Sequence, residues 1–132
     1  MWSASLTGPR VTDAQLVNLR WLTNLERLYL TKTAVSDTGL QHLRELTNLR
    51  WLGLQSMRIT GAGLEHLRGL TNLERLSLVK TQIGDAGLKH LEGLSNLERL
   101  HVMRTRVGDT GLGYLEGLTS ISTLLEAKGN SR

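Results

Sequence analysis

The chain has 132 residues, a length that suits a single domain. It contains no cysteine, which excludes a disulfide framework and a thiolate metal site and favours a reducing, cytoplasmic location. The formal net charge of +4 is compatible with acidic partners. No apolar run is long enough to span a membrane, and the N-terminal segment lacks the apolar core of a signal peptide, so no membrane association is expected.

A pattern of 24 residues recurs along the chain, marked each time by Leu-Thr-Asn-Leu or Leu-Ser-Asn-Leu. Full repeats are predicted at residues 22–45, 46–69, 70–93 and 94–117, all within one domain that covers residues 1–132. Residues 1–21 match the rear part of a unit and are predicted to form a partial N-terminal repeat or cap. Residues 118–132 begin one more unit, which decays toward the C-terminus.

Each unit combines two hydrophobic periods. Leu28 and Leu30 alternate with polar neighbours and predict a short strand, whereas Leu40 and Leu43 predict a helix within residues 36–45. A Ser, Thr or Gly followed in most units by Asp is typical of a helix start. The helix ends are predicted to use left-handed glycines, at Gly69, Gly93 and Gly117. Because one unit cannot bury its leucines alone, the units must stack.

The pattern Leu-x-x-Leu-x-Leu-x-x-Thr-x-Val begins at Leu25, and most units continue as in "VSDTGL" from Val35. It resembles the leucine-rich repeat, of the "Ile-Thr-Asp-x-Gly-Leu" type found in bacterial and F-box-associated proteins. The resemblance implies an α/β solenoid shaped as a short curved horseshoe, with a parallel sheet on the concave face and short helices on the convex face. It also implies a binding scaffold rather than an enzyme. One departure is that the usual Asn or Cys position holds Thr33, Met57, Thr81 and Thr105.

Three columns of recurring polar residues are predicted to be structural. The histidines at positions 42, 66 and 90 cannot share one metal ion, because ligands lie about 2 Å from a metal whereas packed helices lie about 8–10 Å apart. The asparagines at positions 24, 48, 72 and 96 are expected to bond neighbouring backbone, and the aspartates to supply helix charge. No site of converging, different residues is evident, so no catalysis, metal or cofactor is expected.

The residues that flank the inward leucines are expected to face outward on the concave surface. They include no acidic residue, and we predict that they bind an acidic protein partner through this set: Arg27, Tyr29, Lys32, Trp51, Gly53, Gln55, Arg75, Lys80, Arg99, His101, Met103 and Arg104. The sequence "RWLGLQSM" from Arg50 breaks the repeat in the middle of this surface. There Trp51 is predicted to lie between two arginines of the neighbouring strands, with a dent at Gly53 for a partner side chain.

Two other functions agree with the same sequence. A basic groove with aromatic residues could hold single-stranded nucleic acid, although only Tyr29 and Trp51 are aromatic there. Alternatively, the chain could be a structural module of a longer protein, or could self-associate through an exposed sheet edge, so that it is either a monomer or an edge-mediated homo-oligomer. The sequence does not identify the partner.

Overall fold

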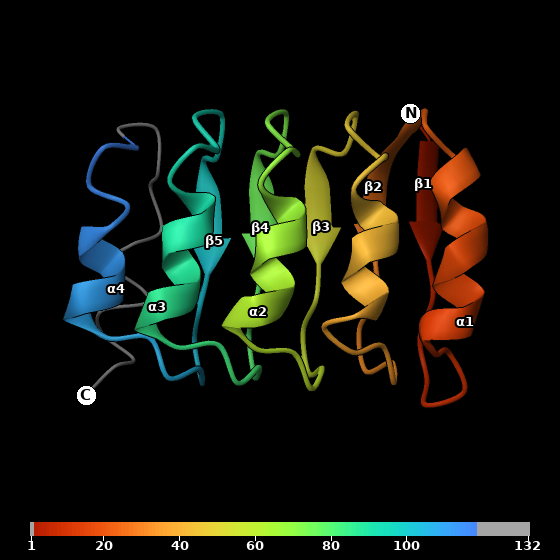
Figure 1. Ribbon diagram of the computed structural model, residues 1–132, viewed down its shortest axis with the longest axis horizontal. Helices are drawn as coiled ribbons and strands as arrows, with labels where there is room; N and C mark the ends of the chain where they lie inside the picture. The colour runs from red at the N-terminus through yellow and green to blue at the C-terminus, as the bar shows by residue number, and fades with distance from the viewer. Residues whose placement is uncertain (1, 119–132) are drawn as a thin grey trace.

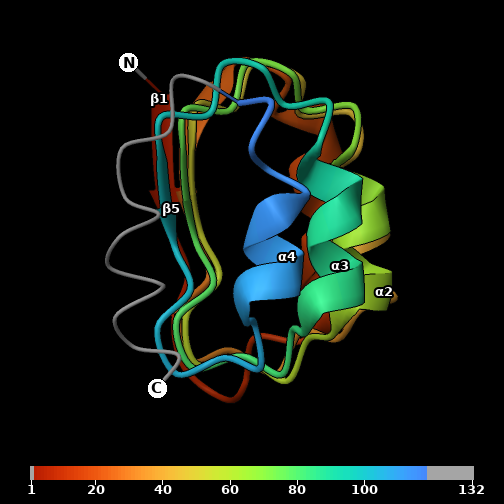
Figure 2. The same cartoon turned by 90° about the vertical axis from the view of Figure 1, so that its left-hand side faces the viewer.

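A computed structural model describes residues 2–118 of the chain. The decayed repeat predicted at residues 118–132 therefore lies almost wholly outside the described residues. Strand and helix alternate in each unit, so that the strands form one layer and the helices a second layer that covers one face of the sheet (Figure 1). Viewed along the array, each unit closes into a loop with its strand on one side and its helix on the other (Figure 2). The predicted solenoid is confirmed.

Within residues 2–118, five strands pair in parallel in chain order to form an open sheet, with one strand from each described unit. The sheet curls little over this length (Figure 1). Equivalent residues of successive units are directly paired, so Leu28 lies beside Leu52 and Leu52 beside Leu76. The strands are β1 (Trp2–Ser5), β2 (Leu25–Tyr29), β3 (Trp51–Gly53), β4 (Arg75–Ser77) and β5 (Arg99–His101).

The helices are shorter and tighter than the sequence pattern suggests. Most units have one α-helical turn that continues as a 3-10 helix, and the unit after β2 has only the 3-10 helix η2 (Gly39–Leu43). The other helices are α1 (Asp13–Leu16), η1 (Val17–Trp21), α2 (Gly61–Leu64), η3 (Glu65–Leu67), α3 (Asp85–Leu88), η4 (Lys89–Leu91) and α4 (Asp109–Gly113). No helix in residues 2–118 is long and apolar enough to cross a membrane.

The prediction of left-handed glycines at the helix ends is wrong. The glycines at positions 69, 93 and 117 do not have positive φ, and among described residues only Gly8 is a glycine with positive φ. The left-handed position instead follows each strand, where φ is 60° at Lys32, 58° at Ser56, 59° at Lys80 and 59° at Arg104. After β2, β3, β4 and β5 the chain thus turns out of the sheet through a residue that has a side chain.

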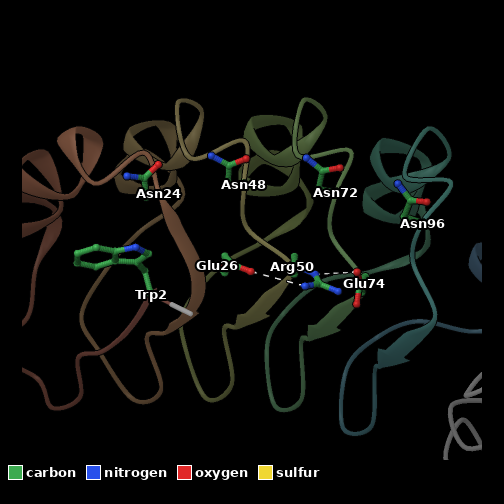
Figure 3. Close-up of a pocket in the computed structure, with 8 residues that line it drawn as sticks. All are labelled: Trp2, Asn24, Glu26, Asn48, Arg50, Asn72, Glu74 and Asn96. Carbon is green, nitrogen blue, oxygen red and sulfur yellow. Dashed lines mark hydrogen bonds and ion pairs between the residues drawn. The ribbon is translucent and has the colours of Figure 1, made fainter.

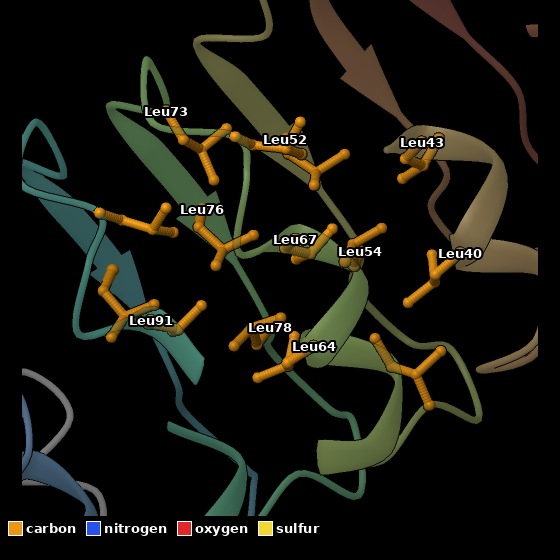
Figure 4. Packing of buried hydrophobic residues seen from close by; sticks show 14 of the residues in the cluster. Leu40, Leu43, Leu52, Leu54, Leu64, Leu67, Leu73, Leu76, Leu78 and Leu91 are labelled. Atoms are coloured by element: carbon orange, nitrogen blue, oxygen red, sulfur yellow. The ribbon is translucent and has the colours of Figure 1, made fainter. Parts of the chain in front are cut away.

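The core is a continuous stack of leucines between the two layers. Leu28, Leu30, Leu40 and Leu43 are fully buried, and the same positions repeat in the following units (Figure 4). Thr81 and Thr105, which hold equivalent positions in two units, donate hydroxyl hydrogen bonds to the carbonyls of Leu78 and Val102. In these two units the threonine therefore satisfies the backbone where the chain leaves the sheet.

Side-chain hydrogen bonds that recur at equivalent positions join successive units, and two such ladders involve asparagine and aspartate. In the first, the amides of Asn48, Asn72 and Asn96 donate to the carbonyls of Thr23, Thr47 and Thr71. The predicted structural role of the asparagines is therefore confirmed. Each of these bonds reaches back across one repeat and satisfies a turn carbonyl of the preceding unit.

The second ladder is made by aspartates, and it does more than supply helix charge. Asp37 accepts hydrogen bonds from the Thr60 backbone N–H at 2.8 Å and from its hydroxyl at 2.5 Å. Asp13 binds Ser36 in the same way, and Asp85 accepts the N–H of Gly108. A glycine of the next unit makes room for each carboxylate: a Cβ added at Gly63 would lie 2.5 Å from Asp37 Oδ1. Gly61 holds the aspartate position in one unit, and there the backbones of Gly61 and Gly87 meet directly.

Candidate functional site

A groove runs across the exposed face of the sheet between β2 and β5. Its volume is about 500 Å³, and we call it the sheet-face groove. The lining combines apolar and cationic side chains from four neighbouring strands and the turns that follow them: Tyr29, Trp51, Leu52, Gly53, Gln55, Arg75, Leu76, Ser77, Val79, His101 and Met103. Seven of these residues belong to the set predicted from the sequence, so the predicted surface includes a real concavity.

Trp51 is held between two arginines. The guanidinium carbon of Arg27 lies 3.5 Å from the centre of the indole ring, and that of Arg75 lies 4.2 Å from it. Because β2 and β4 flank β3, the two cations cover opposite faces of the ring. Arg27 Nε is buried without a hydrogen-bond partner among residues 2–118, as expected for a guanidinium packed on an aromatic face. The predicted cation–π stack is present.

The dent predicted at Gly53 is occupied by the ring of Tyr29. A Cβ at Gly53 would lie 2.9 Å from Tyr29 Cδ1, so the tyrosine ring lies over the glycine and Gly53 itself is buried. The glycine therefore lets Tyr29 lie close to the sheet. The adjoining open part of the groove is bordered by Gln55, Val79 and Met103, of which Met103 is 36% exposed.

The remaining predicted residues are not all at this groove. Arg27 does not line the sheet-face groove but packs on Trp51, which does, and Arg99 is exposed on β5. The side chains of the left-handed positions lie past the ends of the strands, and Lys80 and Arg104 line a separate hollow there. Lys32 occupies the equivalent exposed position after β2. The structure thus divides the predicted surface between a groove on the sheet and a row at the strand ends.

The opposite ends of the strands carry a polar groove of about 620 Å³ (Figure 3). There Arg50 lies between two acids, at 3.6 Å from Glu26 and 2.8 Å from Glu74. The hydrogen bond and charge of Glu74 raise the pKa of Arg50 above its ordinary value. The asparagine ladder forms the rim beside these charges. These polar groups bind each other, so we assign this groove to the stability of the repeat array.

The histidine column has a structural role. Arg44 Nε donates to His66 Nδ1 at 3.0 Å, and Arg68 Nε donates to His90 Nδ1 at 2.9 Å, each across one repeat. Burial, followed by the charge of Arg44, lowers the pKa of His66. The imidazole thus acts as a neutral acceptor. No cluster of three potential metal ligands occurs in residues 2–118.

Three surface residues were missed by sequence reasoning. Arg58 and Gln82 line the hollow at the strand ends, and Arg106 occupies the same exposed repeat position one unit further along. They lie two residues after the left-handed position. The alternation of apolar and polar residues, from which the outward residues of the strand were predicted, ends before this point. The signal that could have identified them is the column itself, which reads Arg10, Ala34, Arg58, Gln82 and Arg106.

Comparison with known proteins supports the repeat assignment. Residues 69–91 and 93–115 match a family model described as "Leucine Rich repeat". An internalin C2 from Listeria monocytogenes aligns over 92% of this chain with 27% identity and a TM-score of 0.64. A second internalin from that organism, inlF, aligns over 92% of this chain with 20% identity and a TM-score of 0.55, which shows the fold alone. No curated protein matches the chain.

The chain is shorter than these structural neighbours. It covers 59% of the internalin C2 chain and 46% of the inlF chain. Their common feature with this molecule is the parallel sheet with one strand per repeat and short helices behind it. Residues 69–91 and 93–115 thus match the leucine-rich repeat model, and the fold of the described residues is similar to that of the two internalins.

Proposed function

We propose that the chain is a non-catalytic protein-binding module and that its partner lies on the exposed face of the sheet. The observation that carries the proposal is the sheet-face groove, in which an arginine–tryptophan–arginine stack adjoins Val79 and Met103. Tryptophan, tyrosine, methionine and arginine are enriched where proteins bind one another. The leucine-rich repeat fold commonly serves as such a module.

The charge of this surface favours an acidic partner. The guanidinium groups of Arg27 and Arg75 lie over the indole, and a guanidinium in this position can still donate from its terminal N–H groups to a carboxylate. Arg99 adds an exposed positive charge on β5, beside Arg75. Such charges raise the rate of encounter with an acidic surface and exclude basic ones.

The same stack makes single-stranded nucleic acid the weaker candidate. Binding of single strands relies on bases that stack on exposed aromatic faces. Here the two faces of Trp51 are occupied by guanidinium groups, and Tyr29 lies against Gly53. The aromatic rings of the groove thus pack against arginines and Gly53, and neither face of Trp51 is free for a base to stack on.

Charge reversal on the sheet face tests the proposal. The double variant Arg75→Glu/Arg99→Glu should lose partners that the wild type captures from nuclease-treated cell extract, as quantified by mass spectrometry. A matched control, Arg20→Glu/Lys89→Glu, makes the same change in charge at exposed positions on the helical side and should keep them. Equal capture by both double variants would refute binding through the sheet face. Protein that the wild type captures from untreated extract but not from nuclease-treated extract would favour nucleic acid.

A further inference from the structure

A second hollow lies past the carboxyl ends of β3 and β4, apart from the sheet-face groove. We call it the strand-end hollow; its volume is about 400 Å³, and it is lined by Ser56, Met57, Arg58, Lys80, Thr81, Gln82 and Arg104. Met57 and Thr81 are 3% and 5% exposed and form its floor. Three cations, one hydroxyl and one amide surround them, and no carboxylate is among these lining residues.

The three cations of this hollow are not used by the fold. Within residues 2–118, the side chains of Arg58, Lys80 and Arg104 have no hydrogen bond or ion pair, and all three are exposed. Other arginines of the chain have clear structural partners, as Arg50 does with its two glutamates. Mutual repulsion of three unpaired cations is unfavourable, and an anion between them would relieve it.

The backbone here is also in an unfavourable conformation. Ser56, Lys80 and Arg104 all have φ close to +60°, a region that residues with a Cβ seldom occupy. The equivalent position in the first unit is Gly8, with φ of 105°, so the fold accepts glycine there. The backbone N–H groups of Ser56 and Lys80 donate to the carbonyls of Val79 and Met103, which holds the strained turns in place. Strained residues with functional side chains are typical of binding sites.

We propose that the strand-end hollow binds a phosphate monoester. A phosphate monoester carries close to two negative charges at neutral pH and several strong acceptor oxygens. Arg58 and Arg104 can present paired N–H donors, Lys80 a compact positive charge, and Ser56 and Gln82 neutral donors. A dianion matches three cations better than a single carboxylate does. The phosphate can belong to a phosphorylated side chain of a protein or to a free phosphorylated molecule.

Glycine substitutions provide a sharp test, because they remove a side chain while relieving backbone strain. In Lys80→Gly and Arg104→Gly the melting temperature should be at or above that of the wild type, so lost binding cannot be attributed to unfolding. Each should bind inorganic phosphate about tenfold more weakly, as measured by NMR titration of backbone amides, since a charge-assisted contact is lost. The matched control Ser56→Gly relieves the same strain, keeps all three cations and should lose no more than about threefold.

Two probes distinguish the source of the phosphate. The blocked amino acid N-acetyl-O-phosphoserine methylamide should bind more tightly than inorganic phosphate if the site takes a phosphorylated side chain, and no more tightly if it takes free phosphate compounds. Either result supports the site, provided that the amides of residues 56–58 and 80–82 shift. Shifts that sodium chloride reproduces at equal ionic strength, or unchanged phosphate binding in Lys80→Gly and Arg104→Gly, would overturn it. Arg75→Glu/Arg99→Glu should still bind phosphate, which separates this site from the sheet-face groove.

Discussion

Asp37 binds both the backbone N–H and the hydroxyl of Thr60, so one carboxylate of one unit fixes the start of the helix in the next. Asp37→Ala should lower the free energy of unfolding by about 1.5–3 kcal/mol, because hydrogen bonds to a charged group are lost and the Thr60 donors are left without an acceptor. Urea denaturation measures the change. Glu45→Ala removes an exposed acid at the end of the same helical segment and should change stability little. Equal effects of the two variants would contradict the role of Asp37.

The stack around Trp51 should affect stability in a manner that depends on salt. Trp51→Leu leaves Arg27 and Arg75 facing one another without the aromatic ring, and we expect a loss of about 1–2 kcal/mol at low ionic strength. Added salt should restore part of this loss by screening the two cations. Chemical denaturation at two salt concentrations is the measurement.

Trp21→Leu is the control for that experiment. Arg20 lies over Trp21 at 4.9 Å, but the tryptophan is 72% exposed and covered by one cation only. Its replacement should have a small effect with no marked salt dependence. A Trp51→Leu variant as stable as wild type at low salt would show that the stack contributes nothing.

The asparagine ladder has a matched control within the chain. Asn72→Ala removes the hydrogen bond to the carbonyl of Thr47 and should cost about 1 kcal/mol. Asn24 occupies the same position in the first full unit, but within residues 2–118 its side chain makes no hydrogen bond. Asn24→Ala should therefore be close to neutral in thermal denaturation. A similar loss in both variants would indicate that the residue acts within its own unit.

Acid should weaken the link between Arg44 and His66. The pKa of His66 lies below its ordinary value of 6.5, so the unfolded chain binds the proton more readily than the fold does. The stability that comes from the neutral imidazole is fully present above about pH 6.5 and is lost as the pH falls through the folded-state pKa. NMR titration of the imidazole protons should report the lowered pKa in wild type, and Arg44→Ala should move it upward. A His66 that titrates at or above 6.5 would contradict this assignment.

The repeat explains why much of the fold and of the sheet face could be predicted. Equivalent residues of parallel strands are direct neighbours, so the order Arg27, Trp51, Arg75 predicted the stack, and the structure confirms it. The reach of Asp37 into the next unit could not be predicted in the same way, because local spacing indicates only a charge at a helix start. The contact is made between residues that lie 23 positions apart.

The left-handed residues were misassigned for a related reason. A glycine that follows an apolar helix pattern commonly ends the helix in the left-handed conformation, and this preference favours Gly69 and its equivalents. In this fold the strained position is set by the turn that leaves the sheet, where the hydrogen-bond ladder continues through Ser56 and Lys80. Residue preferences do not predict a lysine with positive φ, because hydrogen bonds to the next unit hold Lys80 in this conformation. For the same reason the sequence did not predict the strand-end hollow.

Gly61, which stands where other units have aspartate, makes one interface of the array unlike the rest. The stability of a repeat array is a sum of unit terms and nearest-neighbour terms, so the loss of a single link is not shared by the other interfaces. The link missing here is the one that would bind the N–H of Gly84. In brief openings seen by hydrogen exchange, the amide of Gly84 should therefore exchange faster than the amides of Thr60 and Gly108, which aspartates hold.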